Sequence, residues 1–491
     1  MHRRHFLQTS SAAAALALLP AGRLLAGAPE AVTADVQARS GMGTELTLPR
    51  LAVQELAAAM RGPLLLPGME GYESARLVMN RSIDKHPALI AQCSGAADVQ
   101  SAVSFARAHG LLVAVKGGGH SFSGKGTCDG GLMIDLSALR GVRVDPASRT
   151  AWVEGGSLLG EMDHEAMAFG LVTTAGTVSH TGVGGLTLGG GFGRVGRRFG
   201  LALDNVKSVD IVTADGRLRR ASAEQHPDLY WGVRGGGGNF GVVTAFEFQL
   251  HPMDRAVVGG DMIFPQARSK EILQFYSEFT AEAPDELYMD CAMLGGILML
   301  HVCYSGDKRK ADKLLAPLAK LGKPLQNGVK AVDYVALQRS WDNSDPRAMG
   351  EYQKSGFVQE ITPELITAAV DGFETHPDRS TTLFFQHSGG AVGRVAADAT
   401  AFAHRYSNYN MFTSVGWEVG TDSTPHIRQV KKYWSDIEPH TRGFYTNDVY
   451  DESQELVNRN YQGNYARLVE VKNRYDSSNL FRLNANVVPT V

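Results

Sequence analysis

Between residue 90 and about residue 252, short apolar runs alternate with amphipathic stretches, a pattern typical of buried strands connected by helices. A hairpin is predicted around Asp215-Gly216, because Asp-Gly favours the tight turns that join antiparallel strands. The pattern predicts helices over 99–109 and 158–169, and strands over 111–115, 132–136, 150–154, 206–213 and 217–222.

From about residue 256 to 454 the pattern changes: a helix, two apolar strands and another helix follow one another, and this succession occurs twice. This succession predicts an antiparallel sheet with helices on one face. A helical stretch over 452–481 follows, so the whole chain is expected to have an α+β fold. The predicted helices are 270–282, 308–321, 363–373 and 425–437, and the predicted strands are 287–294, 297–304, 382–387 and 410–417.

The chain has 491 residues, more than one hydrophobic core usually holds, so two or three domains are expected. Its 48 basic and 51 acidic side chains give a net charge of −3, which argues against a nucleic-acid partner. The four cysteines form no Cys-x-x-Cys pair, so no metal site is predicted. Separate buried thiols are expected, and a Cys291–Cys303 disulfide across a hairpin is possible if the protein is exported.

The N-terminus carries the features of an export signal. Arg3-Arg4, followed by Phe6-Leu7 and a weakly apolar run, resembles a twin-arginine signal, and Ala26-Gly27-Ala28 supplies small residues for cleavage. Residues 1–28 are therefore predicted to be a signal peptide read by the twin-arginine export machinery, which places the mature protein in the periplasm or outside the cell. The alternative is a frayed basic N-terminus. No run reaches 18 apolar residues, so no stable membrane anchoring is expected. Residues 29–75 are expected to be a linker with one helix over 50–61.

Three glycine clusters stand out among the 55 glycines: 116–121, 176–200 and 234–241. Consecutive glycines allow backbone N–H groups to converge on an anion, because no Cβ keeps the ligand away. Three such loops in one domain favour an extended polyanionic ligand such as a dinucleotide over tight turns alone. A Rossmann unit is rejected. Its glycine fingerprint would be Gly191–Gly196, which should directly follow a strand, but the preceding residues contain too many glycines to form one.

Two sets of residues carry a family resemblance. The segment 115–121 (Val-Lys-Gly-Gly-Gly-His-Ser), with 182–185 (Gly-Val-Gly-Gly) and 204–206 (Asp-Asn-Val), resembles the flavin domain of the vanillyl-alcohol-oxidase superfamily. The tail 464–486 resembles the end of berberine-bridge enzymes. The resemblance implies a two-part PCMH-type FAD-binding domain over 76–255, a substrate domain over 256–454 and a C-terminal segment, 455–491, that returns to the FAD domain.

The resemblance also implies an FAD held covalently by His120 through the flavin 8α-methyl. Relatives with a second link use a cysteine four residues before Gly182, where this chain has Val178, so a single link is expected. Thr181 occupies the position that gates oxygen in relatives, and its small side chain favours an oxidase. The residues implied to bind the cofactor are Lys116, Gly117, Gly118, Gly119, His120, Ser121, Gly176, Thr181, Gly182, Gly184, Gly185, Asn484 and Asn486.

Tyr445 matches the tyrosine that serves as catalytic base in the family, although Asp448 replaces the second tyrosine of the family's Tyr-x-Asn-Tyr. Tyr445 could equally pack between sheet and helix. Gln386 and Asn410 are further catalytic candidates, and the direction in which His387 faces depends on strand register. The resemblance implies hydride transfer from an alcohol or amine carbon of a sugar or secondary metabolite to FAD, with O2 reduced to H2O2. A flavin dehydrogenase using a periplasmic electron carrier and a non-catalytic, flavin-bearing metabolite-binding protein remain the alternatives.

Overall fold

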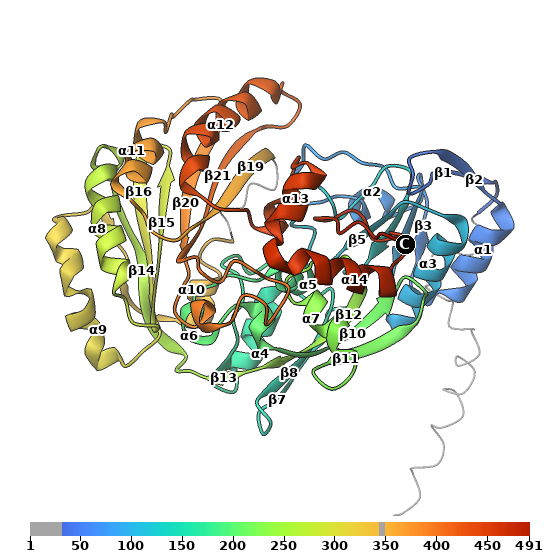
Figure 1. Cartoon of the computed structure of the whole chain (residues 1–491), viewed down its shortest axis with the longest axis horizontal. Helices are drawn as coiled ribbons and strands as arrows, with labels where there is room; N and C mark the ends of the chain where they lie inside the picture. The colour runs from blue at the N-terminus through green and yellow to red at the C-terminus, as the bar shows by residue number, and fades with distance from the viewer. Residues whose placement is uncertain (1–31, 343–348) are drawn as a thin grey trace, which may run out of the picture.

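The computed structural model describes residues 32–342 and 349–491, so the predicted signal peptide at 1–28 lies outside the described residues. The described chain builds two small sheets of one domain, a larger antiparallel sheet of a second domain, and a C-terminal segment that returns to the first (Figure 1). This arrangement confirms the predicted α+β class.

The first small sheet has the strand order β3-β4-β6-β5, in which β4, β6 and β5 run parallel. Helix α3 (Ala96–His109) makes the crossover from β4 to β5, and Val99, Val103 and Ala106 on one of its faces are buried. The helix ends at Gly110, which adopts φ +61°. The strands are β3 (Leu64–Leu65), β4 (Leu89–Gln92), β5 (Val113–Lys116) and β6 (Leu132–Asp135).

The second small sheet is antiparallel and has the order β11-β10-β12-β8-β7. The turn between β10 and β11 contains Asp215-Gly216, with Gly216 at φ +78°, which confirms the predicted hairpin. The strands are β7 (Val142–Asp145), β8 (Thr150–Glu154), β10 (Val206–Thr213), β11 (Leu218–Ser222) and β12 (Gly241–Gln249); the associated helices are α4 (Leu159–Met167), α5 (Val183–Gly189), α6 (Gly196–Phe199) and α7 (Pro227–Val233).

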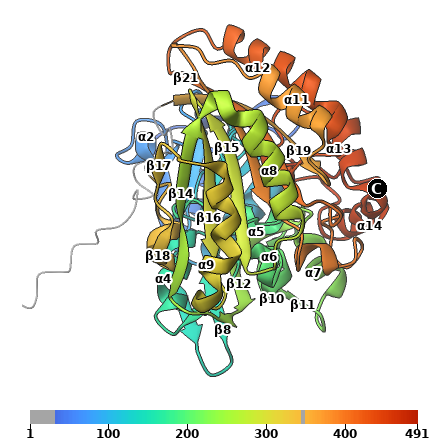
Figure 2. The ribbon, with the colours of Figure 1, turned by 90° about the vertical axis from the view of Figure 1, so that its left-hand side faces the viewer.

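The large sheet has the order β17-β14-β16-β15-β20-β21-β19, with β18 also paired to β14. Helices α8 (Ser269–Ala281), α11 (Pro363–Asp371) and α12 (Thr424–Ile437) cover one face, as predicted (Figures 1 and 2). The opposite face is turned toward the first domain. The strands are β14 (Ala256–Pro265), β15 (Leu287–Leu294), β16 (Ile297–Tyr304), β17 (Gln326–Asn327), β18 (Lys330–Asp333), β19 (Met349–Val358), β20 (Ser380–His387) and β21 (Tyr409–Glu418).

The C-terminal segment leaves the large sheet and lies against the first domain (Figure 1). Helix α13 (Gln454–Asn460) precedes α14 (Tyr465–Tyr475), which packs on α7. The coil after α14 reaches the N-terminal part of the chain, where the Arg482 guanidinium donates a hydrogen bond to the carbonyl oxygen of Gly41 over 2.6 Å.

Several elements differ from the sequence prediction. The stretch 32–75, expected to be a linker with one helix, also contains the hairpin β1 (Val36–Arg39) to β2 (Glu45–Leu48), and its apolar residues Ala38 and Leu48 are buried in the core that α3 also lines. Strands β14 and β19 were missed, because glycines and polar residues interrupt their apolar patterns.

The helix predicted over 308–321 ends earlier. It becomes α9 (Lys308–Leu315) followed by a 3₁₀ turn (Ala316–Leu321), since Pro317 has no N–H to continue the helical bonds. The C-terminal helix is likewise interrupted near Gln462, which adopts φ +51°, and ends at Tyr475.

The possible disulfide is wrong. All four cysteines are free and buried, and the register of the β15–β16 hairpin places Cys291 opposite Leu300 and Cys303 opposite Tyr288. The two sulfur atoms therefore do not face each other across the hairpin, and the expectation of separate buried thiols is confirmed.

Candidate active site

A cavity of about 410 Å³ lies where the two small sheets meet the open face of the large sheet. Its wall combines residues from all three glycine clusters, from the C-terminal coil and from β19, β20 and β21. Segments separated by hundreds of residues therefore form one site.

The first two glycine clusters touch each other through their backbones. A Cβ on Gly118 would lie 2.3 Å from the backbone nitrogen of Gly182, and one on Gly182 would lie 2.3 Å from that of Gly118. No residue other than glycine fits at this contact, since real Cβ atoms do not approach so closely. The contact explains why the sequence has glycine at both positions.

Other glycines face the cavity rather than a neighbour. Gly185, Gly237 and Gly238 all line it, and a Cβ on any of them would meet nothing within 4 Å. The backbone is therefore open to a ligand at these positions, as phosphate-binding loops require. This cradle, together with the buried and unbonded Oδ1 of Asn484 on the same wall, fits a dinucleotide such as FAD.

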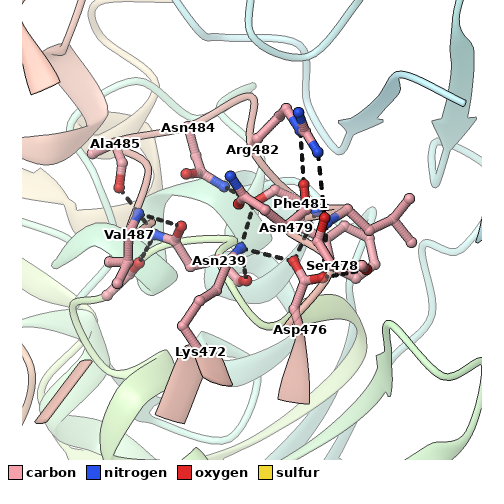
Figure 3. Close-up of polar contacts among 12 residues, drawn as sticks. Asn239, Lys472, Asp476, Ser478, Asn479, Phe481, Arg482, Asn484, Ala485 and Val487 are labelled. Atoms are coloured by element: carbon pink, nitrogen blue, oxygen red, sulfur yellow. Dashed lines mark hydrogen bonds and ion pairs between the residues drawn. The ribbon is translucent and has the colours of Figure 1, made fainter. Parts of the chain in front are cut away.

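The C-terminal coil is held in place by a buried ion pair (Figure 3). The Lys472 ammonium donates to the Asp476 carboxylate over 2.7 Å and to the carbonyl oxygens of Asn239 and Phe481 over 2.8 and 2.9 Å. Both charged side chains are 0% exposed. All three ammonium protons have acceptors, as a buried lysine needs.

Asp476 completes its own bonding within the coil. Its carboxylate accepts hydrogen bonds from the backbone N–H groups of Leu480 and Phe481 over 2.8 and 2.9 Å. The ion pair therefore orders the turn that directs the chain from α14 toward the cavity.

The Asn239 side chain joins this coil to the third glycine cluster. It donates to the carbonyl oxygens of Gly236 and Ala485 over 2.7 and 3.0 Å and accepts from the Val487 N–H over 2.9 Å. This bridge brings Asn484 and Ala485 to the cavity wall.

His120 is the first residue of a hydrogen-bonded chain on the cavity wall. Its Nε2 lies 2.7 Å from Nδ1 of His180, whose Nε2 lies 3.3 Å from the carbonyl oxygen of Asp342. A carbonyl only accepts, so a neutral His180 donates from Nε2 and accepts at Nδ1. A neutral His120 then donates from Nε2 and keeps its lone pair on Nδ1, 3.4 Å from the Thr181 hydroxyl. Sequence reasoning missed His180, since only the fold brings it to His120.

The cavity face of the large sheet carries amides and aromatic rings. Gln386 and Asn410 are directly opposite each other in the β20–β21 register, and the Asn410 amide donates to Oε1 of Gln386 over 3.1 Å. Gln353 and Phe412 share this face. His387 lies on the other face, buried beneath the helices, where burial lowers its pKa well below the usual value, so it does not reach the cavity.

Tyr445 lies on the wall with its hydroxyl group fully engaged. The phenol oxygen accepts from the Gly191 N–H over 2.9 Å and from the Asn447 amide over 2.8 Å, and it donates to the carbonyl oxygen of Leu186 over 3.4 Å. Its ring packs edge-on against Phe192, with 5.2 Å between the ring centroids. Burial raises the pKa of the phenol far above its usual value.

Asp448 also lines the cavity. Burial raises the pKa of its carboxyl to about 7, while hydrogen bonds with Ser355 and Gln353 act to lower it. Its Oδ2 is buried and has no hydrogen-bond partner among the described residues.

Nearly all residues implied by the sequence come together on this wall. Asn486 is the exception: it does not line the cavity, and its carbonyl oxygen instead accepts from the Gln454 amide over 2.7 Å. The predicted residues on the wall are Lys116, Gly117, Gly118, Gly119, His120, Ser121, Gly176, Thr181, Gly182, Gly184, Gly185, Gln386, Asn410, Tyr445 and Asn484.

Residues 32–342 and 349–491 contain no group of three or more histidine, cysteine, aspartate or glutamate side chains placed to hold a metal ion. The same residues contain no helix with the length and apolar character needed to cross a membrane.

Replacing Lys472 by methionine tests the buried ion pair. Lys472→Met keeps the length of the side chain but leaves Asp476 buried without its cation, which should lower the free energy of unfolding by about 3–5 kcal/mol. Arg474→Met is a matched control on the same helix: it removes an exposed pair with Asp228, which should cost no more than about 1 kcal/mol. Chemical unfolding followed by fluorescence measures both. Equal losses in the two variants would contradict the role given to Lys472.

Comparisons with known proteins agree with this geometry. The family model "FAD binding domain" matches residues 87–222, and the model "Berberine and berberine like" matches residues 444–488. An FAD-linked oxidoreductase of Dictyostelium discoideum is 32% identical over 447 residues, which cover 89% of this chain and 97% of the relative.

Two solved structures of similar sequence have the same fold. The 6-hydroxy-D-nicotine oxidase of Arthrobacter nicotinovorans is 26% identical with a TM-score of 0.81, and the match covers 88% of this chain and 98% of that one. The glucooligosaccharide oxidase of Acremonium strictum, whose FAD is described as 6-S-cysteinyl and 8α-N1-histidyl, is 25% identical with a TM-score of 0.81, covering 89% and 100%. The chain belongs to the berberine-bridge-enzyme-like family of FAD-linked oxidoreductases.

Proposed function

We propose that the protein is an FAD-dependent oxidase that removes a hydride from an alcohol or amine carbon of a small molecule. The observation that supports this most directly is the position of His120 on a cavity shared by the glycine loops and the amide-lined face of the large sheet. The cofactor would lie along the loops, and the substrate would lie between it and the sheet.

His120 is the proposed attachment point of the flavin, through its Nδ1. In a neutral His120, the hydrogen-bonded chain to His180 and Asp342 leaves the lone pair on that atom. The glucooligosaccharide oxidase carries both a cysteinyl and a histidyl link. In this chain the cysteine position holds Val178, so a single link is proposed.

When bound, FAD supplies the acceptor for the hydride. The chain's own residues do the rest: the glycine loops and Asn484 hold the cofactor, and Gln386 and Asn410 orient the substrate. The unbonded Oδ1 of Asn410 and Oε1 of Gln353 are both hydrogen-bond acceptors. A substrate rich in hydroxyl or amine donors would satisfy them, and a sugar or a secondary metabolite has such groups.

We further propose that the twin-arginine machinery reads residues 1–28 and exports the protein, and that these residues are then removed, on the pattern of Arg3-Arg4, Phe6-Leu7 and Ala26–Ala28.

His120→Ala tests the covalent link. The wild-type protein is expected to keep yellow flavin in an acid-precipitated pellet, and His120→Ala is expected to release it to the supernatant, because alanine offers no nucleophile. His86→Ala, a change at an exposed histidine, is the matched control and should behave as wild type. Flavin retained by His120→Ala would place the link elsewhere.

Oxygen uptake separates an oxidase from a dehydrogenase. Once a compound is found that bleaches the flavin without air, adding air should restore the yellow colour within the turnover time, with one H2O2 formed for each molecule oxidised. Thr181→Leu should slow this reoxidation at least tenfold by blocking the approach of O2, while leaving the anaerobic bleaching rate nearly unchanged. Reoxidation that requires an added electron carrier would instead support the dehydrogenase.

Replacing both signal arginines tests export. The change Arg3→Lys with Arg4→Lys preserves the positive charge but removes the guanidinium pair, so the precursor is expected to stay in the cytoplasm. Cell fractionation and immunoblotting measure this. Unchanged processing of the double variant would contradict export by this route.

A further inference from the structure

We propose that Asp448 is the group that accepts the substrate's hydroxyl proton, and that Tyr445 is a positioning residue for the second glycine cluster. This inference rests on the proposed oxidase function and names the base within its site.

The hydroxyl group of Tyr445 already uses all its hydrogen-bonding positions, so none is left for a substrate. A phenol oxygen has two acceptor positions and one proton. Here the Gly191 N–H and the Asn447 amide occupy the acceptor positions, and the proton points to the carbonyl oxygen of Leu186. To bond a substrate, Tyr445 would have to give up a contact that holds the loop.

Deprotonation of Tyr445 is also unfavourable. Burial raises the pKa of its phenol, and the negative charge of Asp448 raises it further. With the carboxylate ionised, a tyrosinate at this position would put a second anion beside the first. The charge of Asp448 thus disfavours the ionised phenolate of Tyr445, which is the form that could accept a proton.

Asp448, unlike Tyr445, has a hydrogen-bonding position that is still open. It follows Tyr445 by three residues, lines the same cavity, and has one carboxyl oxygen, Oδ2, with no partner among the residues described. Ser355 and Gln353 of β19 lie beside the carboxyl group and act to lower its pKa. The carboxyl group therefore faces polar groups of the sheet and retains an oxygen that can accept a proton.

The neighbours of Asp448 are the amides a substrate would contact. In the β19–β21 register, Gln353 lies opposite Ser414 and Ser355 lies opposite Phe412, which places both residues on the sheet face that also carries Asn410. The unbonded oxygens of Gln353 and Asn410 lie on this wall as well. A polyhydroxylated substrate could satisfy these acceptors while one hydroxyl donates to Asp448.

The protonation behaviour suits a base. The pKa of Asp448 is raised to about 7, first by burial and also by the charge of Glu452. The other ionisable groups on the cavity wall are Lys116, Lys125, His120 and Tyr445. A base is most effective when its pKa lies near the working pH, and this carboxyl group meets that condition at neutral pH.

The substrate O–H proton passes to the Asp448 carboxylate, the adjacent C–H leaves as hydride to FAD, and the C–O single bond becomes a carbonyl. Dioxygen then takes the hydride's two electrons and its proton, and the proton on Asp448 supplies the second hydrogen of H2O2.

A substrate-free titration provides the first test. The absorbance of bound flavin, measured from pH 5 to 9, should show one protonation step near pH 7 in the wild type and in Tyr445→Phe. The step should be absent in Asp448→Asn, which has the same shape without the acid, and should return in Asp448→Glu. A step that persists in Asp448→Asn, or that vanishes in Tyr445→Phe, would overturn the assignment.

Anaerobic bleaching provides the second test, with cellobiose, xylobiose and 6-hydroxynicotine as probes. With the sugar that reduces the wild type, the reduction rate should fall below pH 7. Asp448→Asn should be slower by at least about 100-fold and insensitive to pH. Tyr445→Phe should keep the wild-type pH profile whatever its rate. An Asp448→Asn protein that reduces at the wild-type rate overturns the inference, whereas a colourless wild type, or one that no probe bleaches, overturns the oxidase proposal itself.

Discussion

The buried ammonium group of Lys472 is the contact on which the geometry of the site depends. From α14 it binds one carboxylate and two carbonyl oxygens, and these acceptors belong to the residue that follows the helix, to the third glycine cluster and to the C-terminal coil. It joins Asp476 and Phe481 to the backbone of Asn239, while the Asn239 side chain holds the coil further along, at Ala485 and Val487. Because a buried charge is tolerated only when all its bonds are made, the three segments must assemble together. The cavity wall is therefore complete only when the last residues of the chain are in place.

A second buried cation performs a similar function between the two domains. Arg194 lies in the second glycine cluster, is 1% exposed, and donates to His301 and Gln338 of the second domain over 2.9 and 2.8 Å. It also donates to the carbonyl oxygen of Thr177, a residue of the cavity wall. The large sheet is thus joined to the flavin loops directly behind the site.

The sequence predicted the parts of this molecule that depend on local pattern. The glycine clusters, the Asp215-Gly216 turn and the predicted helices and strands have signals within a few residues, and the structure contains these elements, although more than half of its described strands were not predicted. Strands β14 and β19 were missed because glycines break their alternation. The direction in which His387 faces could not be predicted either, because it depends on the pairing of β20 with β15 and β21.

The site shows the same division between local and long-range information. His120 could be singled out from the motif around it, but the contact with His180 depends on a fold that joins positions 60 residues apart. For Asp448 the sequence revealed only a departure from the family pattern, an acid in place of a tyrosine. Its meaning follows from contacts that no local pattern contains: Ser355 and Gln353 lie beside it, Tyr445 is already saturated, and burial brings its pKa to about 7. A residue that departs from a family motif is best interpreted through the bonds its neighbours can still make. Of the unbonded oxygens on this wall, that of Asp448 belongs to an acid, whereas those of Gln353, Asn410 and Asn484 belong to amides.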